Sequence, residues 1–96
     1  MVIYEVAAIV EADQAFGFEA FLTEGHIADV LSTAYFSGAA IERCGDCYRI
    51  RYSAVDRARI DEYLEKSAPS LRADFLRHFP SGVKLSREIW EVQAIF

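Results

Sequence analysis

The chain has 96 residues, of which 53% are hydrophobic and 14% aromatic, and its formal net charge at pH 7 is −5. An acidic chain lacks the clustered Lys and Arg needed to bind a nucleic-acid backbone or an anionic membrane surface, so neither partner is expected. The length predicts a single domain over residues 1–96. Its apolar content exceeds what a thin two-layer domain readily hides, which indicates a subunit interface.

No leader sequence, membrane-spanning run or Asn residue is found, so a cytoplasmic location without N-glycosylation is expected. Cys44 and Cys47 should be reduced thiols in that compartment, with an adventitious disulfide across the turn as the alternative. Their Cys-x-x-Cys spacing falls at a predicted hairpin tip rather than at a helix N-terminus, where thioredoxin-type chemistry needs it. Two ligands are also too few for a zinc site, so no metal is expected.

The first part of the chain predicts a strand, a helix and a strand. Residues 2–11 form the first strand, because every even-numbered side chain there is apolar. A helix is expected from Asp13, as its N-cap, to about Ser32, followed by a second strand over 35–44. Apolar residues fall on two sides of this helix, which predicts either a bend near Gly25 or apolar neighbours on both sides.

A third strand is expected over 47–55. Gly45-Asp46 between two β-prone runs predicts a two-residue hairpin turn before it. In this strand the alternate residues Tyr48, Ile50 and Tyr52 should face the helices, and the residues between them should share the other sheet face with those of strand one.

The last part of the chain predicts a divided helix and a long strand. Asp56 is expected to cap a helix that Pro69 divides into segments 56–67 and 69–78, with Pro69 at the first position of the second segment. A final strand over 83–96 is longer than a small sheet requires, so its end is expected to reach another subunit.

The resulting order, βαββαβ, predicts an α+β, ferredoxin-like fold. Right-handed crossovers give a four-stranded antiparallel sheet with helices on one face and strands one and three in the centre. The other face carries Ile3, Ile9 and Trp90 and is left bare. We expect homodimerisation, sheet on sheet, to cover it.

His26 is the candidate catalytic residue. It titrates near neutral pH and lies in mid-helix beside Gly25 and Asp29. It could act as a general base at a cavity wall, or it could be a structural residue hydrogen-bonded to a carbonyl or carboxylate. His78 ends a helix, where a cation is favoured, and is interpreted as structural.

Arg49, Arg51, Tyr48 and Tyr52 are the candidate ligand-binding residues. Two guanidinium groups on a covered sheet face need partners, and Glu5 on the adjacent strand could form cross-strand pairs with them. The alternative is a cavity that holds a small anionic or polar ligand, with Arg51 and Tyr52 near its mouth. No Ser-His-Asp pattern, phosphate loop or dinucleotide fingerprint is present.

Four stretches of this sequence resemble one known family. They are MVIYEV at 1–6, EGHIADVL at 24–31, RY at 51–52 and YLEKSAPSLR at 63–72. Together they resemble an uncharacterised bacterial domain of unknown function within the dimeric α/β-barrel superfamily. The likeness covers nearly the whole chain and is most specific through Ala68-Pro69. It departs at Ala34-Tyr35, where the family commonly has Gly, and at Pro80-Ser81-Gly82, where it often has Gly-Gly.

The resemblance implies a ferredoxin-like protomer whose bare sheet packs against a second copy to form a barrel. Relatives in the superfamily include cofactor-independent monooxygenases of antibiotic biosynthesis, haem-degrading enzymes, lactone isomerases and stress-responsive proteins without known activity. The family itself has no established reaction. A His in its first helix maps onto His26.

The predicted function is therefore that of a homodimeric α/β-barrel protein that binds a small molecule between sheet and helices, without a cofactor. The alternative is a cofactor-independent monooxygenase or isomerase in which His26 is the base and Arg51, Tyr48 or Tyr52 orients the substrate. A haem-binding relative, with His26 as axial ligand, is a further variant of that alternative.

Overall fold

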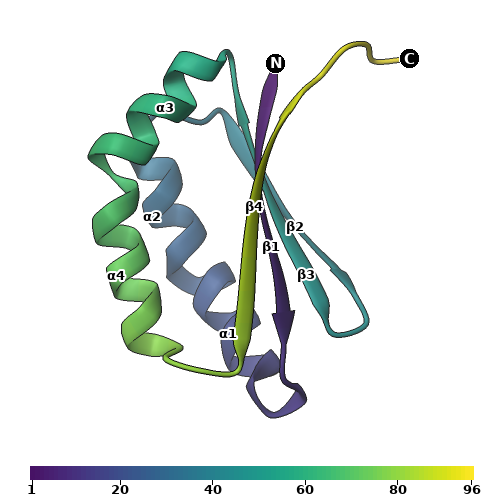
Figure 1. Ribbon diagram of the computed structural model, residues 1–96, viewed down its shortest axis with the longest axis vertical. Helices are drawn as coiled ribbons and strands as arrows, with labels where there is room; N and C mark the ends of the chain where they lie inside the picture. Colours follow the sequence, from purple (N-terminus) through teal and green to yellow (C-terminus); the bar gives the residue numbers. More distant parts are fainter.

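Four antiparallel strands form one sheet in the order β2-β3-β1-β4 in the computed structural model, which describes residues 1–96. The strands are β1 (Val2–Val10), β2 (Gly38–Cys44), β3 (Cys47–Ala54) and β4 (Val83–Glu91). All the helices lie against one face of this sheet (Figure 1). The predicted ferredoxin-like α+β fold, with strands one and three in the centre, is confirmed.

The alternation read from the sequence decides which side chains form the core. Tyr4 of β1 lies opposite Tyr52 of β3 and Ile89 of β4, and residues directly opposite one another share a face. Tyr48, Ile50 and Tyr52 are all buried beneath the helices. The odd-numbered residues of β1 and β3 lie on the other face, which no helix covers.

The first helical stretch is continuous but changes its geometry. It begins as the 3₁₀ turn η1 (Ala12–Gln14), continues as α1 (Ala15–Phe21) and the π-helix η2 (Leu22–His26), and ends as α2 (Ile27–Ser32). The predicted N-cap at Asp13 is wrong, because Asp13 lies inside η1. A backbone bond of 2.9 Å from the Gln14 N–H to the Glu11 carbonyl closes this tighter turn instead.

The π-turn explains the two-sided apolar pattern of this helix. Leu22, His26 and Val30 are spaced four residues apart. In a regular α-helix, each of these positions would be rotated by about 40° around the helix axis from the one before. The wider turn of η2 takes up that rotation, so Leu22 and Val30 are both buried. Ile27 and Leu31 are half-buried against the same core. The helix therefore needs no second apolar neighbour.

The second helical stretch divides as predicted. Asp56 caps α3 (Arg57–Lys66) by accepting a 3.0 Å hydrogen bond from the Arg59 N–H. The next helix, α4 (Ala68–His78), has Pro69 at its second position rather than its first. Proline is tolerated at both positions, since neither N–H has an intrahelical acceptor.

Two predicted strands are longer than the observed ones. β2 starts at Gly38 because the chain first turns at Ala34, whose φ is 67°, and then buries Phe36. β4 ends at Glu91, and the last backbone bond beyond it runs 3.0 Å from the Val92 N–H to the Met1 carbonyl. The following residues run away from the sheet (Figure 1).

The β2–β3 hairpin has the predicted two-residue turn. Gly45 has a φ of 62°, and Cys44 and Cys47 lie directly opposite each other across the turn. Glycine at the first central position is typical of type II′ turns. Both cysteines are exposed, free thiols.

None of the helices combines the length and apolarity that crossing a membrane would demand.

Candidate functional site

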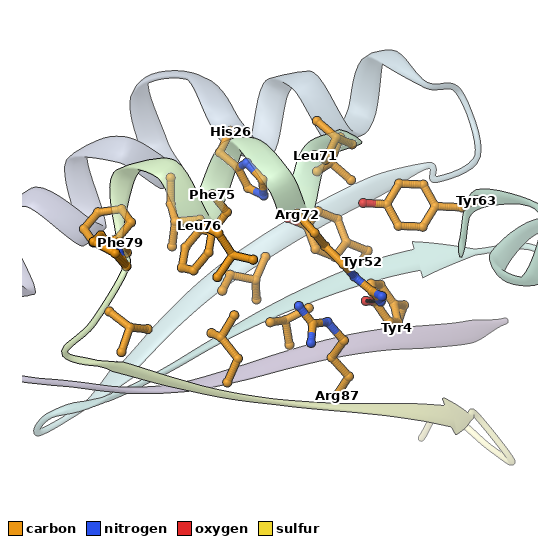
Figure 2. Close-up of a pocket in the computed structure, with 17 residues that line it drawn as sticks. Tyr4, His26, Tyr52, Tyr63, Leu71, Arg72, Phe75, Leu76, Phe79 and Arg87 are labelled. Carbon is orange, nitrogen blue, oxygen red and sulfur yellow. Dashed lines mark hydrogen bonds between the residues drawn. The ribbon is translucent and has the colours of Figure 1, made fainter. Parts of the chain in front are cut away.

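A cavity of about 390 Å³ lies between the helix-facing side of the sheet and the helices η2, α2 and α4. Most of its lining is apolar and comes from Val6, Leu22, Val30, Ile50, Leu71, Phe75, Leu76, Phe79, Pro80, Val83 and Leu85. Its polar lining comes from Tyr4, His26, Tyr52, Tyr63, Arg72 and Arg87. Figure 2 shows these side chains converging from both layers.

His26 is the only imidazole in this lining. The π-turn η2 ends at His26 and directs its ring from the helix toward the sheet (Figure 2). The ring stacks on Phe21, with centroids 5.2 Å apart and planes at 27°. Its Nδ1 is buried and has no hydrogen-bond partner in the protein. The predicted structural role, a hydrogen bond from the ring to a carbonyl or carboxylate, is not seen for this nitrogen.

Burial lowers the pKa of His26 below its usual 6.5, because the charged imidazolium loses hydration among the apolar side chains. The negative charges of Asp74 and Asp29 oppose this shift, whereas the positive charge of His78 adds to it. The imidazole is consequently neutral at pH 7. A neutral ring can accept a proton or a hydrogen bond from a molecule in the cavity.

Two arginines line the cavity, one from each of its two layers. Arg72 belongs to α4, and its Nη2 donates a 3.3 Å hydrogen bond to the Tyr4 hydroxyl. Arg87 belongs to β4 and lies opposite Val6, so it shares the helix-facing side of the sheet. Both side chains reach into the space between α4 and β4 (Figure 2), and both residues remain exposed to solvent.

Three tyrosine hydroxyls lie at the same end of the cavity as the arginines. Burial raises the pKa of Tyr63 to about 12, and the positive charges of Arg72 and Arg87 act against that rise. Burial also raises the pKa of Tyr52, with added effects from Tyr63 and Tyr4. Tyr52 and Tyr63 therefore keep their protons at pH 7 and can donate hydrogen bonds.

The structure brings only two of the predicted site residues, His26 and Tyr52, into this cavity. Adjacent residues of a strand point to opposite faces, so Arg51 cannot share a cavity mouth with Tyr52 in one protomer. Its Nε lies 3.5 Å from Glu5 Oε1 on the bare face. The paired prediction of Arg51 and Tyr52 at one mouth is therefore wrong, although the cross-strand pair with Glu5 is present.

Arg49 and Tyr48 lie elsewhere. Arg49 is on the bare face, and its ion pair is with Glu42 of β2, whose Oε1 lies 2.7 Å from the Arg49 Nε. Tyr48 faces the helices, but its hydroxyl donates a 2.9 Å hydrogen bond to Glu19 of α1, outside the cavity lining. Neither side chain reaches His26, and a ligand-binding role for either stays a prediction.

Sequence reasoning missed Tyr4, Tyr63, Arg72 and Arg87 as site residues. One signal for Arg87 was available, because it interrupts an otherwise apolar alternation along β4. Arg72 gave no such signal, since it lies on an exposed flank of α4.

No group of three or more His, Cys, Asp or Glu side chains is arranged to hold a metal ion.

The chain matches a known family over nearly its whole length. Residues 1–93 match the DUF4286 family, which is described as a domain of unknown function. The chain belongs to that family. The resemblance drawn from the sequence to an uncharacterised family is confirmed. A search of the curated proteins finds no match.

Three solved structures share the fold. A candidate antibiotic biosynthesis monooxygenase from Deinococcus radiodurans has a TM-score of 0.71 at 14% identity, over 100% of this chain and 96% of that chain. An EthD-family protein from Bacillus halodurans has a TM-score of 0.75 at 10% identity, over 97% of this chain and 100% of that one. An uncharacterized NIPSNAP domain protein from Burkholderia xenovorans has a TM-score of 0.72 at 15% identity, over 100% and 98%. At such identities the likeness concerns the fold alone.

Proposed function

We propose that the protein is a homodimer of ferredoxin-like domains, each spanning residues 1–96, and that each protomer binds a small organic molecule between its sheet and its helices. The observation that carries the proposal is the cavity of about 390 Å³ with its mainly apolar lining and convergent polar groups. Its volume lies within the range of about 300–1,000 Å³ that is typical of ligand pockets.

The bare sheet face supports the dimer. Ile9 is 53% exposed and Trp90 49% exposed, although both are large apolar residues on this face. The Nε atom of Arg51 is buried there without a hydrogen-bond partner, because the nearest Glu5 oxygen is at ion-pair rather than hydrogen-bonding distance. A second copy would cover the apolar side chains and could provide the missing acceptor.

The surface area points the same way. A folded monomer of 10.8 kDa exposes about 5,500 Å² on average. This chain exposes 6022 Å². The excess includes the side chains of the bare face and of the C-terminal Ile95 and Phe96, which are 78% and 116% exposed. A dimer interface of ordinary size removes roughly 800 Å² from each partner, which is enough to account for it.

Light scattering over a range of protein concentrations tests the dimer. The wild-type chain should have twice the protomer mass down to low micromolar concentration. Ile9→Lys should shift it toward the monomer, because the substitution places a charge on the sheet face that the second copy is proposed to cover. Phe16→Lys is the matched control, since Phe16 is 89% exposed on α1, away from this face. A wild-type monomer would contradict the proposal.

A fragment screen by protein-observed NMR tests the cavity. Binders should shift the amide signals of lining residues. They should also lose affinity in Val6→Phe, because Val6 lines the cavity from the central strand β1 and a larger side chain would occupy part of the space. Ala73→Phe is the matched control, as it adds the same ring on the exposed side of α4. The proposal would be contradicted by fragments that shift only signals outside the lining, or by fragments whose affinity Val6→Phe leaves unchanged.

A second candidate function is a cofactor-independent oxygenase or isomerase with His26 as its base. The observation that favours it is the neutral imidazole of His26 in the cavity wall, with a buried nitrogen that no protein group satisfies. As an isomerase, the ring would take a proton from one carbon of the substrate and return it to another. As an oxygenase, it would take a proton from an activated CH2 group of an aromatic substrate. The carbanion would add molecular oxygen and regain the proton from His26 as a hydroperoxide, and loss of water would leave a carbonyl at that carbon.

Turnover of phenolic and lactone substrates with His26 variants tests this candidate. Activity should require the unprotonated imidazole, so the rate should fall at acid pH and His26→Gln should abolish it. His78→Gln is the matched control, because this second histidine lies at the exposed end of α4 outside the cavity lining. Activity that survives His26→Gln would exclude the role of His26 as the base.

A further inference from the structure

The cavity collects positive charge without negative charge, although the chain as a whole is acidic. The chain carries fifteen Asp and Glu residues against ten Lys and Arg. None of the fifteen carboxylates lines the cavity, whereas Arg72 and Arg87 both do. An even distribution of the charges would favour acidic residues there. The lining is therefore selectively cationic.

Arg72 and Arg87 also lack carboxylate partners elsewhere. Five of the ten basic side chains form ion pairs with Asp or Glu, namely Arg49, Arg51, Arg57, Lys66 and Arg77. The one hydrogen bond from Arg72 goes to the Tyr4 hydroxyl rather than to a carboxylate. An inward charge on an edge strand can guard against aggregation, which would account for Arg87 on β4. It does not account for Arg72, which lies on a helix.

The neighbouring hydroxyls extend the set of donors. Tyr4, Tyr52 and Tyr63 line the same end of the cavity as the arginines. Among the three, only Tyr4 makes a hydrogen bond within the protein, and there it accepts from Arg72. The Tyr52 and Tyr63 hydroxyls are thus available to donate to an acceptor held between the guanidinium groups. Arginine pairs with tyrosine donors favour an oxyanion over a neutral polar group.

The opposite end of the cavity has a different character. Phe75 and Phe79 of the α4 end and Val83 and Leu85 of β4 line it, and the uncharged ring of His26 beside Phe75 is the polar side chain there, as Figure 2 shows for the labelled Phe75, Phe79 and His26. We infer that the ligand is an amphipathic organic acid. Its anionic group lies between Arg72 and Arg87, and its apolar body lies against the Phe75 end. This inference rests on the proposed function of the cavity as a small-molecule site.

The volume limits the size of this acid. A cavity of about 390 Å³ corresponds to about 13 waters at roughly 30 Å³ each, which suggests a molecule of about a dozen non-hydrogen atoms. Decanoate and phenylbutyrate have this size and bear one carboxylate. Decanol is the matched uncharged probe, since it has the same chain length without the charge.

Calorimetric titration of the three probes into the intact protein tests the inference. Decanoate and phenylbutyrate should bind more tightly than decanol. Arg72→Gln and Arg87→Gln should each weaken acid binding by about 10-fold and leave decanol binding unchanged, because each removes one charge-assisted contact. Both arginines are exposed, so the variants should fold, and circular dichroism checks this. Arg59→Gln is the charge-matched control, because exposed Arg59 of α3 lies outside the lining.

The outcomes separate the two proposals. Equal binding of decanol and decanoate, unaffected by the arginine variants, would overturn the charge inference while leaving the cavity as a small-molecule site. An acid affinity that falls as much in Arg59→Gln as in Arg87→Gln would show a diffuse charge effect and would also overturn it. Failure of all three probes to bind, together with a fragment screen that finds no ligand, would overturn the proposed function itself.

Discussion

Ala34 offers a sharp test of the backbone geometry that ends the first helix. It follows α2 and has a φ of 67°, which is the left-handed region. A residue with a Cβ costs about 1–2 kcal/mol there, whereas glycine is unstrained. Its N–H donates a 3.1 Å hydrogen bond to the Leu31 carbonyl, and its side chain is exposed. Ala34→Gly therefore removes strain without removing a packing contact.

The size of the effect follows from two opposing terms. Relief of the left-handed strain contributes about 1–2 kcal/mol to stability. The greater freedom of glycine in the unfolded chain costs about 0.4–1 kcal/mol. We expect Ala34→Gly to raise the free energy of unfolding by about 0.5–1 kcal/mol, and the melting temperature by roughly 2–8 °C for a domain of this size.

Urea unfolding followed by circular dichroism measures this change. All variants are compared at one protein concentration, because the stability of a dimer depends on it. Ala73→Gly is the matched control: it makes the same substitution at an exposed position inside α4 and should cost about 1 kcal/mol. If Ala34→Gly destabilises the protein as much as Ala73→Gly does, the argument from strain at Ala34 is refuted.

Three further predictions concern single groups. Burial lowers the pKa of His26, so near this pKa the folded state binds fewer protons than the unfolded state. The free energy of unfolding should therefore fall as the pH drops through about 6.5. Urea unfolding at about pH 8 and pH 5.5 should show this fall in the wild type and a smaller one in His26→Gln. Asp56→Ala removes the acceptor of the Arg59 N–H and should lower the free energy of unfolding by about 1 kcal/mol, measured in the same assay. The hydrogen bond to Asp46 raises the pKa of the Cys47 thiol. Asp46→Asn should therefore speed the alkylation of Cys47 by iodoacetamide near pH 8, measured by mass spectrometry. An unchanged rate would show that this contact does not control the reactivity of the thiol.

The shared fold gives the cavity its position but not its chemistry. The three similar structures have 10–15% identity to this chain, so their names say nothing about which groups line its cavity. The groups that separate one possible function from another are His26 and the pair Arg72 and Arg87. The variants His26→Gln, Arg72→Gln and Arg87→Gln change these three side chains and leave the common scaffold intact.

The sequence alone determined the elements and their order. Strand alternation is a period-2 signal that each residue carries locally, so the buried positions of β1 and β3 were predicted correctly. Asp56, Pro69 and the pair Gly45-Asp46 are local too, since capping, proline geometry and turn formation depend on neighbours in the chain. Right-handed crossovers then leave one topology for this order of elements.

Only the tertiary structure decided which polar side chains meet. Arg72 and Arg87 come from α4 and from an edge strand, and their approach depends on how that helix packs on that strand. The separation of Arg51 from Tyr52, by contrast, follows from strand alternation alone, which the sequence already indicated. The π-turn that directs His26 into the cavity left only an indirect trace in the sequence, the apolar pattern on two sides of the helix that predicted a bend near Gly25. The placement of Arg72 and Arg87 in one cavity is a long-range packing outcome. Local sequence patterns do not specify how far apart residues of different helices and strands lie in space.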